Sequence, residues 1–251
     1  MSPVQNAARP QLYARLAGLL YLIVILFGGF AEGFVMNKLT VPGDAGATIN
    51  NILSSPELWR LGLIANLVVP LVAVVQLWLE YLIFRPAGER LALLFVLLNL
   101  ASLSVEAVSK VFMLMIQPAA IMTSNGASHD VAFGLARMWL TAQDLSFHVA
   151  LIFFGSACLV SGWLIFRSGF LPKAIGLIFQ LAGVSYLVAS FAALFAPEFG
   201  VSLAPWIFIP VLAGEVSLCL WLLIRGVNVE AWRQAASAAS RSAPSATVTN
   251  H

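Results

Sequence analysis

Six ionisable side chains of this chain lie within or beside long apolar stretches of sequence. They are Glu32, Glu106, Lys110, Asp144, His148 and Glu215. An ionisable residue inside a membrane span costs about 2.5–3.5 kcal/mol on insertion scales, so such residues usually face the interior of a helical bundle. We therefore take these six side chains as candidates for lining a cavity and binding a ligand.

Two pairs of candidates are spaced by four residues, which places both members of each pair on one face of a helix. Glu106 and Lys110 form a potential ion pair, whereas Asp144 and His148 form a titratable pair whose imidazole changes charge near neutrality. Counting about 1.5 Å per residue places Glu215 near the middle of the bilayer and the other candidates in its outer half. The spacing predicts a polar cavity between the first, third and fourth predicted helices, open to the outer face.

A purely structural interpretation of these polar residues also stays open. Buried polar side chains hold membrane helices together, and each interhelical hydrogen bond contributes about 0.6 kcal/mol. The first pair is compatible with that role. Glu32 can also be an outer-edge residue that faces water, and we expect Glu80 and Arg137 to be interfacial, with their charged ends in water. Glu215 is harder to explain in this way, because an acid in the middle of a span cannot reach water.

The composition indicates an integral membrane protein. Of 251 residues, 61% are hydrophobic and 10% are charged, and the mean hydropathy is +0.93. A soluble domain is about 45–50% apolar and about 25% charged, so the composition excludes a soluble enzyme and a disordered regulator. The net charge of +2 and the lack of a basic run argue against nucleic-acid binding. Cys158 and Cys219 lie in apolar stretches without metal-ligand spacing, and we expect them to be core residues.

Six stretches are apolar over the roughly 20 residues that a helix needs to cross the bilayer. They cover residues 12–32, 60–84, 91–117, 143–166, 173–195 and 204–225. Isolated strands would leave backbone groups unsatisfied in lipid, so we predict an all-α, polytopic transmembrane bundle. An alternative for the first stretch is a cleaved signal peptide, with Gly29-Phe30-Ala31 as the small-x-small site; five spans would then remain.

The basic residues predict that both termini are cytoplasmic. With that orientation the inner loops and tails hold Arg9, Arg15, Arg85, Arg90, Arg167, Lys173, Arg225, Arg233 and Arg241. The opposite side receives only Lys38, Arg60 and Arg137. This asymmetry follows the positive-inside rule, and the expected location is the bacterial inner membrane.

The chain divides into an N-terminal tail (1–11), a six-helix transmembrane domain (12–228) and a cytoplasmic C-terminal tail (229–251), which we expect to be disordered. In the first outer loop, Asp44 is predicted to cap a short interfacial helix that reaches about Leu53. A turn at 123–128 is predicted next, and Ser128 caps a helical stretch that continues into the fourth span.

Two strings of similar sequence recur in the first and fifth spans: Leu16-Ala17-Gly18-Leu19-Leu20-Tyr21-Leu22 and Leu181-Ala182-Gly183-Val184-Ser185-Tyr186-Leu187. They indicate either helical hairpins descended from one unit, as in some transporters, or a chance match in a restricted alphabet. Both interpretations stay open.

An ordered set of motifs resembles one family over most of the chain, from Ala14 to Val227. The motifs are Val41-Pro42-Gly43-Asp44-Ala45, Asn51-Ile52, Arg60-Leu61-Gly62 and Leu164-Ile165-Phe166-Arg167-Ser168-Gly169-Phe170-Leu171-Pro172. They are similar to those of the bacterial membrane-protein family known as domain of unknown function 4386. The resemblance implies a polytopic helical protein of bacteria, and it implies no activity, substrate or catalytic residue.

Three classes of function follow from these side chains. The first is a transporter of protons, an ion or a small solute, or a small-ligand-binding protein, that uses an outward-facing polar cavity. The second is a non-catalytic sensor or an accessory or assembly subunit that binds a lipid or a membrane partner, including a second copy of the chain. An enzyme is disfavoured, because His148 is the one histidine at membrane depth and a catalytic metal needs about three ligands. We therefore expect no metal and no cofactor.

Overall fold

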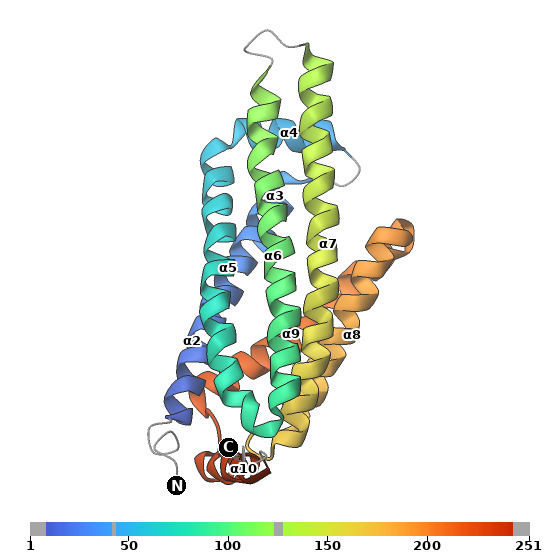
Figure 1. Ribbon diagram of the computed structural model, residues 1–251. Coiled ribbons are helices and arrows are strands. Elements are labelled where there is room, and N and C mark those ends of the chain that lie inside the picture. Colours follow the sequence, from blue (N-terminus) through green and yellow to red (C-terminus); the bar gives the residue numbers. More distant parts are fainter. Residues whose placement is uncertain (1–8, 42–43, 123–127, 243–251) are drawn as a thin grey trace, which may run out of the picture.

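The computed structural model describes residues 9–41, 44–122 and 128–242, and this part of the chain is largely helical (Figure 1). In chain order its elements are α2 (Pro10–Gly28), the π-helix η1 (Gly29–Met36), α3 (Asn37–Leu39), α4 (Ala45–Ser54), α5 (Pro56–Phe84), the 3-10 helix η2 (Arg85–Ala87), α6 (Glu89–Ala120), α7 (His129–Ser168), α8 (Lys173–Phe195), α9 (Pro197–Ile224) and α10 (Val229–Ser242).

Within these ranges, six helical segments are long and apolar enough to cross a membrane. They are Pro10–Leu39, Pro56–Ala87, Glu89–Ala119, Asp130–Ser168, Lys173–Phe195 and Trp206–Ile224. The predicted all-α architecture with six spans is confirmed at this level. The first and fourth segments are longer than predicted, because η1 and α3 extend the first helix and α7 begins well before residue 143.

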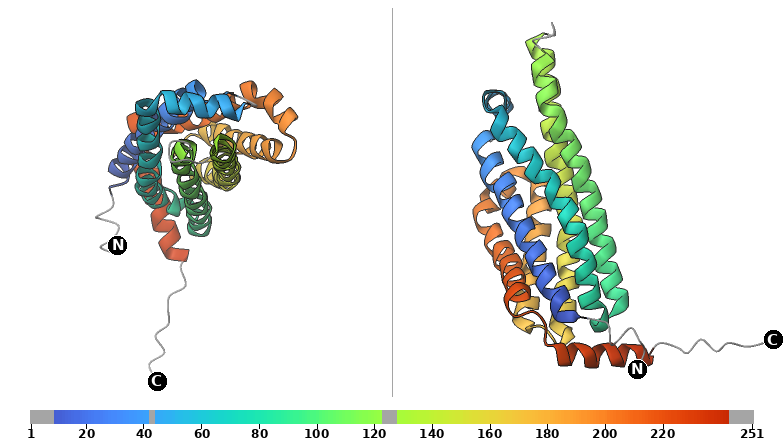
Figure 2. Two further views of the ribbon diagram at one scale, coloured as in Figure 1. Left: turned by 90° about the horizontal axis from the view of Figure 1, so that it is seen from above. Right: turned by 90° about the vertical axis from the view of Figure 1, so that its left-hand side faces the viewer.

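The six long helices pack side by side in a closed ring (Figure 2). In this ring α2 contacts α5 and α9, α6 contacts α5 and α7, and α8 contacts α7 and α9. Large apolar side chains cover the outside of the ring; Leu71, Leu177 and Trp206 are each more than half exposed. Such a surface suits contact with lipid, so the chain has the architecture of a multi-pass membrane protein.

We call the end of the bundle where α2 begins and α10 lies the inner end, and the opposite end the outer end (Figure 2). The inner apolar cluster includes Tyr21, Phe95, Cys158, Cys219 and Leu222. The outer apolar cluster includes Val35, Ile49, Ile52, Trp59, Met113 and Ile116. Both expected core cysteines are buried.

Helices α6 and α7 form a hairpin that extends past the other helices at the outer end (Figure 1). Helix α7 has 40 residues and is therefore about 60 Å long, twice the roughly 30 Å thickness of the hydrocarbon core. The Ser128 hydroxyl accepts a hydrogen bond of 3.4 Å from the Val131 amide, as predicted for the N-cap. The rest of the turn predicted at 123–128 lies outside the described residues.

The short helix α4 lies across the outer end of the bundle (Figure 1). Its predicted N-cap is confirmed, because Oδ1 of Asp44 accepts a hydrogen bond of 2.8 Å from the Ala47 amide. Ile49 and Ile52 are each 1% exposed and anchor this helix in the outer apolar cluster. The turn predicted just before it includes Pro42 and Gly43, which lie outside the described residues.

The C-terminal segment differs from the disordered tail expected from residue 229 onward. Residues Val229–Ser242 form α10, which lies across the inner end (Figures 1 and 2). The indole Nε1 of Trp232 donates a hydrogen bond of 3.0 Å to the carbonyl oxygen of Ile83, and this side chain is 5% exposed. The expectation was wrong for this helix because composition does not reveal an anchor of this kind; residues 243–251 lie outside the described residues.

Glycines bring neighbouring helix backbones into contact. A Cβ added at Gly18 of α2 would lie 2.5 Å from the backbone nitrogen of Leu223 in α9. A Cβ added at Gly155 of α7 would lie 2.9 Å from the carbonyl oxygen of Gly183 in α8. Small residues at such positions let membrane helices gain van der Waals contact, which is a main source of their association in lipid.

We expect Gly18→Ala to destabilise the bundle, because the added methyl group would collide with the α9 backbone. Overpacking of this kind typically costs about 1–3 kcal/mol. Gly28→Ala is the matched control on the same helix, since nothing lies within 4 Å of its Cβ position. Thermal unfolding of the purified proteins in detergent measures the difference. Equal unfolding temperatures for the two variants would contradict the close packing of α2 on α9.

Candidate functional site

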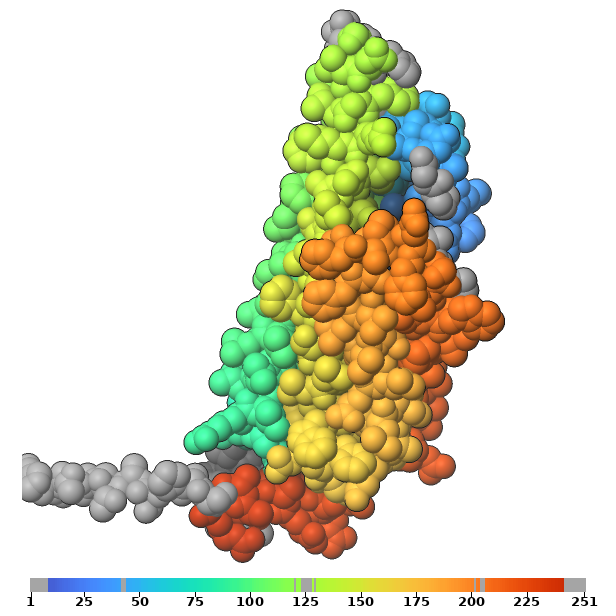
Figure 3. Space-filling model, turned by 90° about the vertical axis from the view of Figure 1, so that its right-hand side faces the viewer, coloured from blue at the N-terminus to red at the C-terminus, as the bar shows by residue number. Residues whose placement is uncertain are grey.

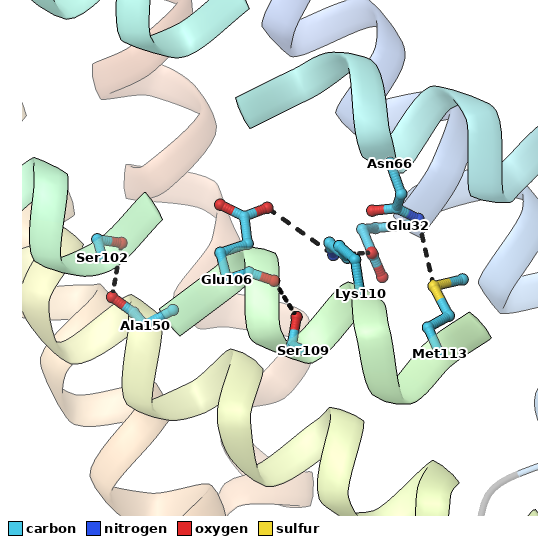
Figure 4. Close-up of polar contacts among 8 residues, drawn as sticks. All are labelled: Glu32, Asn66, Ser102, Glu106, Ser109, Lys110, Met113 and Ala150. Carbon is cyan, nitrogen blue, oxygen red and sulfur yellow. Dashed lines mark hydrogen bonds and ion pairs between the residues drawn. The ribbon is translucent and has the colours of Figure 1, made fainter. Parts of the chain in front are cut away.

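The ammonium group of Lys110 lies between two carboxylates towards the outer end of the bundle (Figure 4). Its Nζ is 3.1 Å from Oε1 of Glu32 and 3.8 Å from Oε1 of Glu106. The Lys110 side chain is 1% exposed, although the Glu32 side chain is 32% exposed. We call these three residues the outer triad. The predicted ion pair of Glu106 with Lys110 is present, and Glu32 adds a partner that spacing along α6 could not reveal.

The π-helix η1 carries Glu32 to this position. The predicted first span ends near Glu32, whereas in the structure α2 ends at Gly28 and the next eight residues form wider π turns. Inserting π turns changes the directions in which the following side chains point, and such turns are frequent at functional sites. Gly28, Gly29 and Gly33 favour this departure, because glycine weakens the preference for a regular α-helix.

Neighbouring helices enclose the Lys110 ammonium. Its Nζ lies 4.8 Å from the centroid of the Phe147 ring of α7, which is a cation–π contact. Asn66 of α5 lies nearby, and its Nδ2 contacts the sulfur of Met113 at 3.8 Å (Figure 4). Met113 belongs to the outer apolar cluster. The members of the triad therefore come from η1 and α6, whereas α5 and α7 supply neighbouring side chains.

The structure keeps Asp144 away from the outer triad. Nε2 of His148 is 3.8 Å from Oδ1 of Asp144, so the predicted pair is present, but the Asp144 side chain is 69% exposed. The His148 ring lies 6.4 Å from the ring of Phe147, the residue that contacts Lys110. Nδ1 of His148 is buried without a hydrogen-bond partner within the described part of the chain. Among the ion pairs of the described ranges, His148 and Asp144 pair with each other and not with a member of the triad.

Glu215 belongs to a second group of polar residues, nearer the inner end. Its Oε1 accepts a hydrogen bond from the Tyr186 hydroxyl of α8. Tyr21 of α2 belongs to the inner apolar cluster, and Tyr186 packs against that cluster. We call this group the inner cluster; it consists of Tyr21, Gln76, Glu80, Tyr186 and Glu215.

The expectation that Glu80 reaches interfacial water is wrong. Its side chain is buried at 6% exposure, and Nε2 of Gln76, one turn earlier on α5, donates a hydrogen bond of 2.9 Å to its Oε1. Both residues share the buried face of α5 with Ile83, so the carboxylate points into the bundle. The ion pairs found in the described ranges include neither Glu80 nor Glu215. Arg137, by contrast, is exposed as predicted.

Four residues of these two groups and their surroundings were not predicted from the sequence: Tyr21, Gln76, Phe147 and Tyr186. Tyr21 and Tyr186 occupy the same position in the two recurring strings, so that similarity was the signal that could have found them. Gln76 stands four residues before Glu80, which is the spacing of a helical pair. Nothing in the sequence distinguishes Phe147 from the other apolar residues of its helix.

One known family matches most of the chain. The family model described as domain of unknown function DUF4386 matches residues 16–226. The chain belongs to the DUF4386 family. The match reaches from the first span to the last, and the resemblance predicted from the motifs is confirmed. No curated protein and no solved structure matches this DUF4386 protein.

The reactive side-chain groups of the outer triad and the inner cluster are mainly carboxylic acids, an amide and phenols. Within the described residues, no three His, Cys, Asp or Glu side chains are arranged to hold a metal ion. The outer triad has two acids for one base, and the inner cluster has two acids. Both groups therefore suit the binding of protons or cations, because each has more acidic than basic side chains.

We expect Lys110→Met to destabilise the protein strongly, because it leaves Glu32 and Glu106 without a cation in apolar surroundings. Removing one partner of a buried ion pair costs about 3–5 kcal/mol. Arg60→Met is the matched control, since Arg60 pairs with Glu57 at 2.9 Å on the surface, where a pair contributes about 0–1 kcal/mol.

Thermal unfolding in detergent measures both effects. Adding Glu106→Gln to Lys110→Met should recover part of the lost stability, because it removes one unpaired acid. If Lys110→Met were as stable as Arg60→Met, the ion pairs of the outer triad would not form as described.

Proposed function

We propose that this DUF4386 protein is a transporter that moves protons or another small cation or solute through the interior of its helical bundle. The observation that carries the proposal is Glu215: a half-buried acid in the middle part of α9 that accepts a hydrogen bond from the Tyr186 hydroxyl of α8. The outer triad serves as the binding region of an outward-facing polar cavity in the same route.

Energetics favour a functional role for these acids over a purely structural one. Each ionisable side chain in a span costs about 2.5–3.5 kcal/mol, whereas an interhelical hydrogen bond returns about 0.6 kcal/mol on average. A serine or glutamine could supply such a bond at lower cost. Two acids without a paired base, Glu80 and Glu215, are therefore better explained by a task that needs a change of charge.

The acids are spread along the length of the bundle. Glu80 lies four residues from the inner end of α5, and Glu215 lies nine residues from the inner end of α9. At about 1.5 Å per residue these separations are about 6 Å and about 14 Å. Glu106 lies seventeen residues, about 26 Å, from the inner end of α6.

The proposed orientation places the inner end in the cytoplasm of a bacterial cell. Helix α2 begins and α10 lies at that end (Figure 2). The same end carries the two basic loops between α5 and α6 and between α7 and α8, which hold Arg85, Arg90, Arg167 and Lys173. An excess of basic residues in short loops marks the cytoplasmic side of a membrane protein.

One observation favours a second candidate function, that of a sensor or an accessory subunit. The α6–α7 hairpin extends past the other helices, and Val131 and Met138 on its outer part are each at least half exposed (Figure 1). A projecting apolar surface suits a partner protein or lipid headgroups. That function requires no flux, so a transport measurement separates the two candidates.

We expect Glu215→Gln to abolish transport while the bundle stays folded, because glutamine keeps the hydrogen bond with Tyr186 but cannot change its charge. Purified protein in vesicles with an internal pH dye measures flux under imposed proton and salt gradients. Glu198→Gln is the matched control, since Glu198 is exposed on the same helix. Equal flux in the two variants, or no flux with the parent protein under any gradient, would contradict the proposal and favour the sensor.

A further inference from the structure

The inner end of α5 carries an acid whose charge no neighbouring group balances. Glu80 is 6% exposed, and its hydrogen-bond partner Gln76 is a neutral amide. The ion pairs of the described ranges do not include Glu80. A carboxyl group in such surroundings is neutralised by a proton or by a bound cation, because isolated charges are strongly disfavoured in apolar surroundings.

The amide of Gln76 supplies a second, independent observation. Its Nε2 bonds to the Glu80 carboxylate, whereas its Oε1 is buried and has no hydrogen-bond partner within the described part of the chain. The side chain is 8% exposed, so bulk water does not satisfy this oxygen. A buried acceptor without a partner costs about 1–3 kcal/mol. A cation beside the carboxylate would engage the acid and the amide oxygen together.

The groups around Glu80 are oxygen donors and apolar side chains. Glu80 and Gln76 supply the oxygen donors, and Leu77, Leu79 and Ile83 are buried beside them on α5. Carboxylate, amide and hydroxyl oxygens are ligands for hard cations. A single positive charge balances the Glu80 carboxylate, whereas a divalent ion calls for a second ionised acid beside it, and the hydrogen-bond partner of Glu215 is the Tyr186 hydroxyl.

We propose that Glu80 and Gln76 form a binding site for a monovalent alkali cation, Na⁺ or K⁺, at the inner end of the bundle. The site lies about one helical turn from the inner end of α5. This inference rests on the proposed transport function, and it names Na⁺ or K⁺ as the cation that binds along the proposed transport route. Binding itself is measured without any flux.

The test is the rate at which a hydrophobic carbodiimide labels Glu80 in the purified, full-length protein in detergent, followed by peptide mass spectrometry. Labelling is compared in sodium, potassium and choline chloride at equal ionic strength. Sodium or potassium at ten times the dissociation constant should slow labelling of Glu80 about tenfold, because about a tenth of the sites stay free. The ion that gives protection at the lower concentration is the preferred cation.

Two controls accompany this measurement. Glu89 is an exposed acid at the inner end of α6, and its labelling in the same sample should not respond to the cation. Gln76→Leu keeps Glu80 and removes the amide oxygen, so we expect it to lose the protection. Equal labelling of Glu80 in all three salts with the parent protein would overturn the site, whether or not the variant folds.

The outcomes also separate this site from the proposed transport function. Protection of Glu80 without flux in vesicles would leave the cation site standing and contradict transport. Flux that depends on Glu215, together with labelling of Glu80 that ignores both cations, would do the reverse.

Discussion

The cost of placing a charge in lipid is the constraint on which this structure depends. Each ionisable group within the spans needs a partner or a proton, or the helix that carries it would not insert stably. The outer triad meets this requirement by enclosing Lys110 between two carboxylates and the face of Phe147. The inner cluster meets it differently, because its acids contact a phenol and an amide. This difference between the two groups favours transport of charge over a purely structural role in holding the helices together.

The helices of the bundle are held together both by close backbone packing and by polar contacts. Glycines of α2, α7 and α8 hold neighbouring helices at backbone contact, and such packing leaves little freedom to move. The π-helix η1 is also in close contact with α5, since a Cβ added at Gly62 would lie 2.7 Å from Cγ1 of Val35. Figure 3 shows α8 packed against the lower part of α7, with the α6–α7 hairpin rising above it.

The sequence was sufficient for the six spans, for both helix caps in the outer loops and for the ion pair within α6. Those features depend on local composition and on spacing along one helix, which a single sequence displays. The environment of Glu80 was not predictable in this way, because its distance from the helix end suggested water and only the ring of helices buries it. The contact of Glu32 with Lys110 was not predictable either, because the π-helix η1 turns the Glu32 side chain in a direction that regular α-helical spacing does not give. Helix α10 depends on one buried tryptophan, and composition alone indicated disorder.

The central claim is that water from the outer side reaches the polar interior at the outer triad. It is tested most directly by placing a cysteine at Glu106 or at Val108 in a chain whose two native cysteines are replaced by alanine. Val108 is 48% exposed on the apolar outside of the same helix. A membrane-impermeant, water-soluble thiol reagent applied to the outer face reacts with the thiolate, which needs water to form. The account predicts that the Glu106→Cys protein is modified and the Val108→Cys protein is not; no modification at position 106, or modification at position 108 alone, would contradict it.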